Sequence, residues 1–126
     1  MCASLHPEST QNLTSGSGAS EFIPYTNWIP AMSVKWVKAI IDLMSRTQNF
    51  EARFALQTAT TNPDVPNAPV LKDSWINSTG KVLSSFLDVS ADVDGHFYVR
   101  FGVAVRNGTG TALERGEVGL LVSTRT

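Results

Sequence analysis

The sequence is poor in the residues that build cross-linked or reactive sites. It contains one cysteine and two histidines, so an internal disulfide is excluded and a transition-metal centre with three or four ligands is not expected. Cys2 is interpreted as an incidental thiol, because an activated thiolate needs a base or a helix N-terminus beside it. His96 begins a predicted strand and is interpreted as a solvent-facing side chain rather than a general base.

Charge and long apolar runs are also scarce. Only 17% of the residues are charged and the formal net charge is −1, which gives no electrostatic argument for a nucleic-acid or acidic-membrane partner. No apolar run approaches the about eighteen residues that a membrane span needs, and the N-terminus has no secretory signal pattern. We therefore expect synthesis in the cytoplasm and association through shape and apolar contact.

Catalytic motifs are missing in recognisable form. The sequence has no glycine-rich phosphate loop, no nucleophile elbow and no Ser/His/Asp order. Asp92 and Asp94 flank a predicted turn at residues 91–95, and they lack the ligand spacing of a calcium loop. We expect a protein that is not an enzyme and that uses no cofactor and no metal.

An alternating apolar pattern dominates what is present. Within residues 95–108 the apolar side chains of Phe97, Val99, Phe101, Val103 and Val105 share one parity, which is the period of a half-buried central strand. Residues 50–58 and 117–124 alternate in the same way, and residues 71–75 predict a weaker strand. Residues 82–89 predict another strand, in which Leu83, Leu87 and Val89 share one parity. Residues 33–44 fit both a strand and a helix with Ser33 as N-cap, and the abundance of Val, Ile and Trp favours the strand.

Turn residues predict how these strands are connected. Residues 45–49 and the Asn107–Gly108 pair are each expected to close a hairpin. The prolines in residues 21–30 indicate an irregular or edge segment, and those in residues 60–69 indicate a stiff loop. The sequence thus predicts an all-β antiparallel sandwich, jelly-roll or immunoglobulin-like, over residues 21–126.

Residues 1–20 are rich in Ser, Thr, Gly, Asn and Gln, a composition that cannot repay its own ordering entropy. They predict a flexible N-terminal arm. Such an arm either stays unstructured or orders on a neighbouring subunit.

Two sets of side chains are candidate binding residues. The outward face of the central strand carries Tyr98, Arg100 and Arg106, joined by Arg53 if its strand is adjacent, and tyrosine and arginine are enriched at interfaces. The alternative is an ordinary solvated sheet face. A second set would stack on sugar rings if it lined one exposed face, and it comprises Trp28, Trp36 and Trp75.

These features favour a non-enzymatic assembly protein, a repeated subunit of a larger particle such as a virus or phage virion accessory protein (capsid decoration or tail). Its partners would be further copies of itself or other subunits, and its location the virion. The alternative hypothesis is a carbohydrate-binding β-sandwich module.

Overall fold

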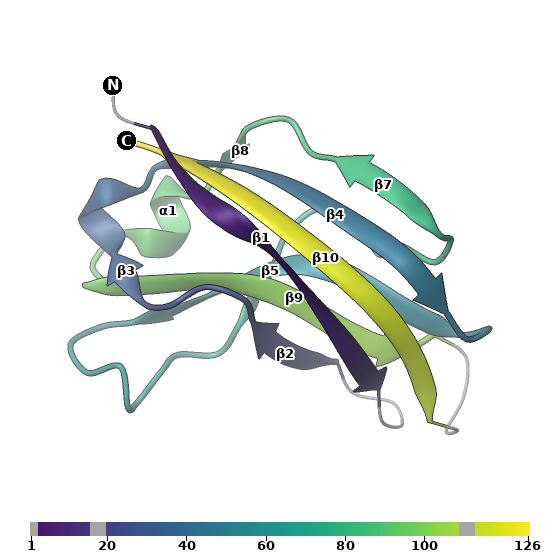
Figure 1. The fold of residues 1–126 in the computed structure, drawn as a ribbon. Coiled ribbons are helices and arrows are strands. Elements are labelled where there is room, and N and C mark those ends of the chain that lie inside the picture. The colour runs from purple at the N-terminus through teal and green to yellow at the C-terminus, as the bar shows by residue number, and fades with distance from the viewer. Residues whose placement is uncertain (1–2, 16–19, 109–112) are drawn as a thin grey trace.

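The computed structural model describes residues 3–15, 20–108 and 113–126, and it shows two antiparallel β-sheets packed face to face (Figure 1). Sheet A has the strand order β1, β10, β4, β7, and β8 also pairs with β4. Sheet B has the order β2, β9, β5, β6, and β3 also pairs with β9. The predicted all-β antiparallel sandwich is confirmed.

The element bounds are as follows. Sheet A comprises β1 (Ala3–Ser15), β4 (Trp36–Arg46), β7 (Gly80–Leu83), β8 (Leu87–Asp88) and β10 (Glu114–Arg125). Sheet B comprises β2 (Glu21–Pro24), β3 (Ile29–Pro30), β5 (Phe50–Ala59), β6 (Val70–Leu71) and β9 (Tyr98–Asn107). Two short helical pieces complete the described part of the chain, the 3-10 helix η1 (Ala31–Ser33) and the helix α1 (Ser90–Val93).

The strands pair in a nested order. The strand β1 pairs with β10, β2 and β3 pair with β9, β4 pairs with β7 and β8, and β5 pairs with β6. Successive pairs therefore alternate between the two sheets, as in a long hairpin rolled up around a core. This is the jelly-roll arrangement rather than the immunoglobulin-like one.

Both predicted hairpins are wrong. The strands β4 and β5 lie in different sheets, and so do β9 and β10. The turn after β4 is instead tied to β10, because Thr47 N donates to Arg115 O at 2.8 Å. Turn-forming residues reverse the direction of the chain. They do not determine whether the next strand pairs with the preceding one or enters the other sheet. Here the return crosses the core, since both strands bury one apolar face.

The N-terminal segment also differs from its prediction. Ala3–Ser15 form the edge strand β1, antiparallel to β10, with an irregular register between His6 and Ser9. The polar composition predicted that this segment would not order alone, and pairing with β10 supplies the backbone hydrogen bonds that it lacks in isolation. The sandwich therefore includes β1, while Cys2 and residues 16–19 of the predicted arm lie outside the described residues.

The inward faces of the two sheets form one apolar core. In β9 the residues Val99, Phe101, Val103 and Val105 are fully buried, as their parity predicted. Phe97, which was expected on the same face, precedes β9 and is 64% exposed. The Phe101 ring stacks on that of Phe54 from β5, with centroids 6.0 Å apart. The strand interpretation of residues 33–44 is confirmed by β4, whose inward side chains are buried: Val37, Ala39, Ile41 and Leu43.

The remaining strand and loop predictions are met in part. The expected strand at 71–75 is replaced by β6, and the one at 82–89 is divided between β7 and β8. Residues 91–95, predicted as a turn, contribute most of the single turn α1. The proline-containing segment 21–30 supplies β2 and β3 at the edge of sheet B, as expected, and residues 60–69 form a loop.

A tyrosine between β2 and β3 joins the two sheets. The Tyr25 hydroxyl donates a hydrogen bond to the carbonyl oxygen of Val118 in β10 at 2.7 Å. Because Tyr25 lies on the sheet B side and Val118 belongs to sheet A, this bond connects the two sheets. Burial raises the pKa of the Tyr25 phenol above its usual range, since the phenolate would be poorly solvated there.

Candidate functional site

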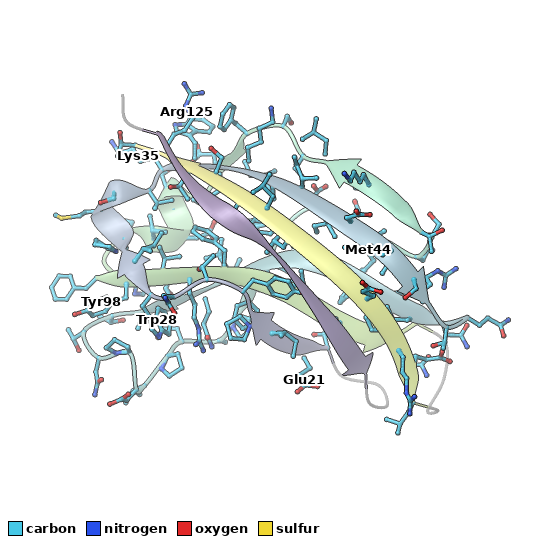
Figure 2. The ribbon with its side chains drawn as sticks, in the orientation of Figure 1. Glu21, Trp28, Lys35, Met44, Tyr98 and Arg125 are labelled. Carbon is cyan, nitrogen blue, oxygen red and sulfur yellow. The ribbon has the colours of Figure 1, made fainter. Side chains whose placement is uncertain are left out.

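The outward face of sheet B brings together the four predicted interface residues. Tyr98, Arg100 and Arg106 share one parity of β9, and Arg53 joins them because it lies opposite Ala104 in the β5–β9 pairing. In Figure 2 Tyr98 and Trp28 lie on the sheet B side of the sandwich, and Arg125 lies on the sheet A side. We define the arginine face as three arginines and the aromatic rings that contact them: Arg53, Arg100 and Arg106 with Phe22, Trp28 and Trp75.

Arg100 occupies the loop-60–69 end of the arginine face. Its guanidinium carbon lies 4.4 Å from the centroid of the Trp28 ring and 5.9 Å from that of Phe22. Its Nε and Nη2 both donate to Gln57 Oε1, at 3.0 and 2.7 Å. Gln57 in turn donates to the backbone oxygen of Asn67 at 3.0 Å. Arg100 is therefore held by strand, edge segment and loop together, and burial lowers the pKa of its guanidinium.

Arg53 and Arg106 share one aromatic ring. Their guanidinium carbons lie 5.8 and 4.0 Å from the centroid of Trp75. Arg106 Nε forms an ion pair with Glu51 Oε1 at 2.8 Å, and Arg53 Nε donates to the backbone oxygen of Lys72 at 3.2 Å. These contacts fix both side chains against the sheet, with Trp75 as a common support.

The backbone next to Trp75 is fixed as well. Ile76 exchanges two backbone hydrogen bonds with Ala52 of β5, at 2.7 and 3.1 Å. The segment between β6 and β7 is thus attached to the sheet one residue beyond Trp75. Sequence reasoning identified the arginines from strand parity, but it did not place Trp28, Trp75 or Gln57 beside them, because these contacts depend on where the connecting segments fold back.

The three tryptophans do not form a common platform. Trp36 belongs to β4 of sheet A, where it pairs with Asp88 and Arg125, whereas Trp28 and Trp75 contact the outward side of sheet B. The rings of Trp28 and Trp75 also carry guanidinium groups on their faces. The condition set for the sugar-stacking hypothesis, a row of tryptophans on one exposed face, is therefore not fulfilled by this geometry.

The outward face of sheet A carries a second surface that the sequence did not single out. Ile40 of β4 lies between Leu121 of β10 and Leu83 of β7 in the strand register, so the three form one row across the sheet. Leu83 is 60% exposed. We define the apolar strip as this row with the two neighbouring exposed aromatics: Trp36, Ile40, Leu83, Phe86 and Leu121.

Sequence parity had placed Leu83 on the same side as Leu87 and Val89. In the structure Ser84 is buried instead, with its amide donating to Ala39 O at 2.9 Å and its hydroxyl to Asp73. This break in the alternation turns Leu83 outward. The polar Ser84 within a largely apolar segment indicates that the alternation is irregular, but it does not show where the strand breaks.

A hollow at one end of the sandwich, about 540 Å³ in volume, lies between η1 and α1. Its lining combines apolar side chains with Lys35, Asp94 and His96. His96 Nδ1 lies 2.9 Å from Thr60 Oγ1. Over residues 3–15, 20–108 and 113–126 no three His, Cys, Asp or Glu side chains gather as metal ligands, and no helix there has the length and apolarity to cross a membrane.

Comparison with known proteins gives a match in fold alone. No family model and no curated protein matches the sequence. Among solved structures, the chain is similar to one from the structure of infectious bursal disease virus, Gx strain, with a TM-score of 0.55 and 8% identity. The match covers 99% of this chain and 33% of that chain, so this chain spans about a third of the viral chain's length. The comparison agrees with the jelly-roll strand order of the two sheets.

Proposed function

We propose that this chain is a non-enzymatic structural subunit that repeats in a larger particle such as a virus or phage virion. The observation that carries the proposal is the fold match to a chain of a virus structure over 99% of the present chain. Jelly rolls recur in viral capsids, where the rigid sandwich serves as a building block. Because the same fold also serves lectins and other proteins, the surfaces of the sandwich supply the second argument.

Two distinct surfaces support an assembling role. The apolar strip lies on the outside of sheet A, and the arginine face lies on the outside of sheet B. They lie on opposite sides of the sandwich, so one copy can contact different neighbours through each. Exposed side chains such as Leu83 and Phe86 would be removed from water in such contacts, which favours association.

Solution mass tests the proposal. Light scattering on the full chain over a wide concentration range is expected to show a discrete oligomer. The substitution Leu83→Asp places a charge in the apolar strip and is expected to shift the protein toward monomer. Val65→Asp is the matched control, because Val65 is 71% exposed in the loop between β5 and β6, away from the strip. A monomer at every concentration, or equal effects of the two variants, would contradict the proposal.

A further inference from the structure

We infer that the arginine face binds an extended acidic segment of a partner protein, with the outer guanidinium nitrogens as receptors for its carboxylates. The inference adds the chemistry of one partner to the proposed function. It rests on that function only for the expectation that the partner belongs to the same particle.

The first argument is the way the arginines are held. In each of Arg53, Arg100 and Arg106 the Nε atom already donates to an acceptor of the sheet or of the segments beside it. Each guanidinium also lies over a tryptophan ring. This leaves the Nη1–Nη2 edge as the available donor edge, in a fixed orientation. In Arg100 the Nη2 atom also donates to Gln57 Oε1, so its second N–H and those of Nη1 remain. A planar guanidinium fixed in this manner suits bidentate binding of a carboxylate, with little further loss of side-chain entropy.

The second argument is charge balance. Arg106 is paired with Glu51, and Lys72 of the neighbouring segment is paired with Asp92 at 2.6 Å. Within the described part of the chain Arg53 and Arg100 have no carboxylate partner. The face thus keeps an excess of positive charge although the whole chain has a net charge of −1. A partner with carboxylates is complementary to this face.

The third argument is spacing. Arg53 lies opposite Ala104, so Arg100 is four residues away along β9 and Arg106 is two residues away in the other direction. At about 3.4 Å per strand residue, the strand positions of the three arginines span roughly 20 Å along the sheet. One small anion cannot bridge that distance. An extended chain that runs along β9 reaches all three with carboxylates at intervals of a few residues.

The surroundings favour a protein over a nucleic acid. The tryptophan faces that could stack on bases carry guanidinium groups already. Glu51 lies within the face and Glu21 is exposed on the adjacent β2, and both would repel a continuous phosphate backbone.

The test uses a synthetic peptide of alternating Asp and Thr, capped at both ends, and an Asn-and-Thr peptide as its uncharged control. Tryptophan fluorescence is recorded in the full chain carrying Trp36→Phe, so that only Trp28 and Trp75, both on the arginine face, report. The Asp peptide is expected to change the signal in a saturable, salt-sensitive way, and the Asn peptide is expected to leave it unchanged.

Variants locate the binding site. Arg100→Gln and Arg53→Gln are each expected to weaken binding about tenfold, the effect of one lost charge-assisted hydrogen bond. Arg125→Gln is the matched control, because it removes the same charge and another ring-stacked arginine, 4.4 Å from Phe86, but on sheet A. It should change the affinity less than twofold. Arg100→Lys keeps the charge and loses the planar fork, so it is expected to weaken binding severalfold.

Several results would overturn the inference. These are no saturable response to the Asp peptide, an equal loss in Arg125→Gln, full affinity in Arg100→Lys, or tighter binding of an oligothymidylate of equal charge. Circular dichroism confirms that each variant is folded, and if Arg100→Gln is not, Arg100→Lys and Arg53→Gln carry the test. Light scattering on the same samples separates the two proposals. If the protein is an oligomer but does not bind the Asp peptide, only this inference is refuted. If it is a monomer that binds the peptide, only the proposed self-assembly is refuted.

Discussion

The bond between Tyr25 and Val118 predicts a specific dependence of stability on pH. At neutral pH, Tyr25→Phe removes one hydrogen bond between the sheets, and we expect the free energy of unfolding to fall by about 1 kcal/mol. Because burial raises the pKa of Tyr25 in the folded state, its contribution is fully present below about pH 10, the unfolded value. It is lost progressively as the pH rises above that value, since only the unfolded chain then releases the proton.

The size of this alkaline effect has an upper limit. One group contributes at most about 1.4 kcal/mol per pH unit, and solvent screening of a phenol that is not fully enclosed keeps the loss below that limit. Urea denaturation at several pH values from neutral to above 10 measures it. Tyr98→Phe is the matched control, because within the described residues the Tyr98 hydroxyl has no hydrogen-bond partner. Equal alkaline destabilisation of wild type and Tyr25→Phe would refute the reasoning.

Three further predictions concern the core, a close approach of two strands and a loop anchor. Phe54→Ala empties a fully buried site and should cost about 3–5 kcal/mol in urea denaturation, whereas Phe97→Ala, at a residue 64% exposed, should change stability by less than about 0.5 kcal/mol. Gly102→Ala would place a Cβ atom 2.0 Å from Ile23 O, so we expect the free energy of unfolding to fall by about 1–3 kcal/mol. Hydrogen exchange should show early loss of amide protection in β2, and unchanged protection there would contradict this prediction. Hydrogen bonding from Thr47 lowers the pKa of Glu114 in the folded protein. The contribution of Glu114 to stability is therefore present above the usual Glu pKa and is lost as the pH falls through the folded value. Glu114→Gln should flatten the acid side of the stability–pH profile, and an unaltered slope would contradict the assignment.

The sequence predicted the strands better than their connections. Alternation identified β9 and β5, and it placed Arg100, Arg106 and Tyr98 on one face, because side-chain direction in a strand follows local parity. It could not predict that the turns after β4 and β9 lead into the opposite sheet, since that choice depends on burying two apolar faces against each other. The strand β1 was missed for a related reason, because its partner β10 is almost the whole chain away.

The candidate site was predictable only in its strand residues. The pairing of β5 with β9 brings Arg53 to Arg100 and Arg106, and parity supplied that expectation once adjacency was assumed. The rings beneath the guanidinium groups come from Trp28 and Trp75, which lie outside the strands. Their positions depend on the path of irregular segments, for which the sequence has no periodicity to follow.

The nested pairing of strands also determines how the molecule reaches its folded state. The strand β10 pairs with β1 on one side and β4 on the other, so sheet A remains divided until residues 114–125 are available. Closing loops this long before any pairing energy is gained makes folding slow, on the millisecond-to-second scale of β-sandwiches. During synthesis on the ribosome, the edges of β1 and β4 that pair with β10 therefore stay unpaired until β10 has been made.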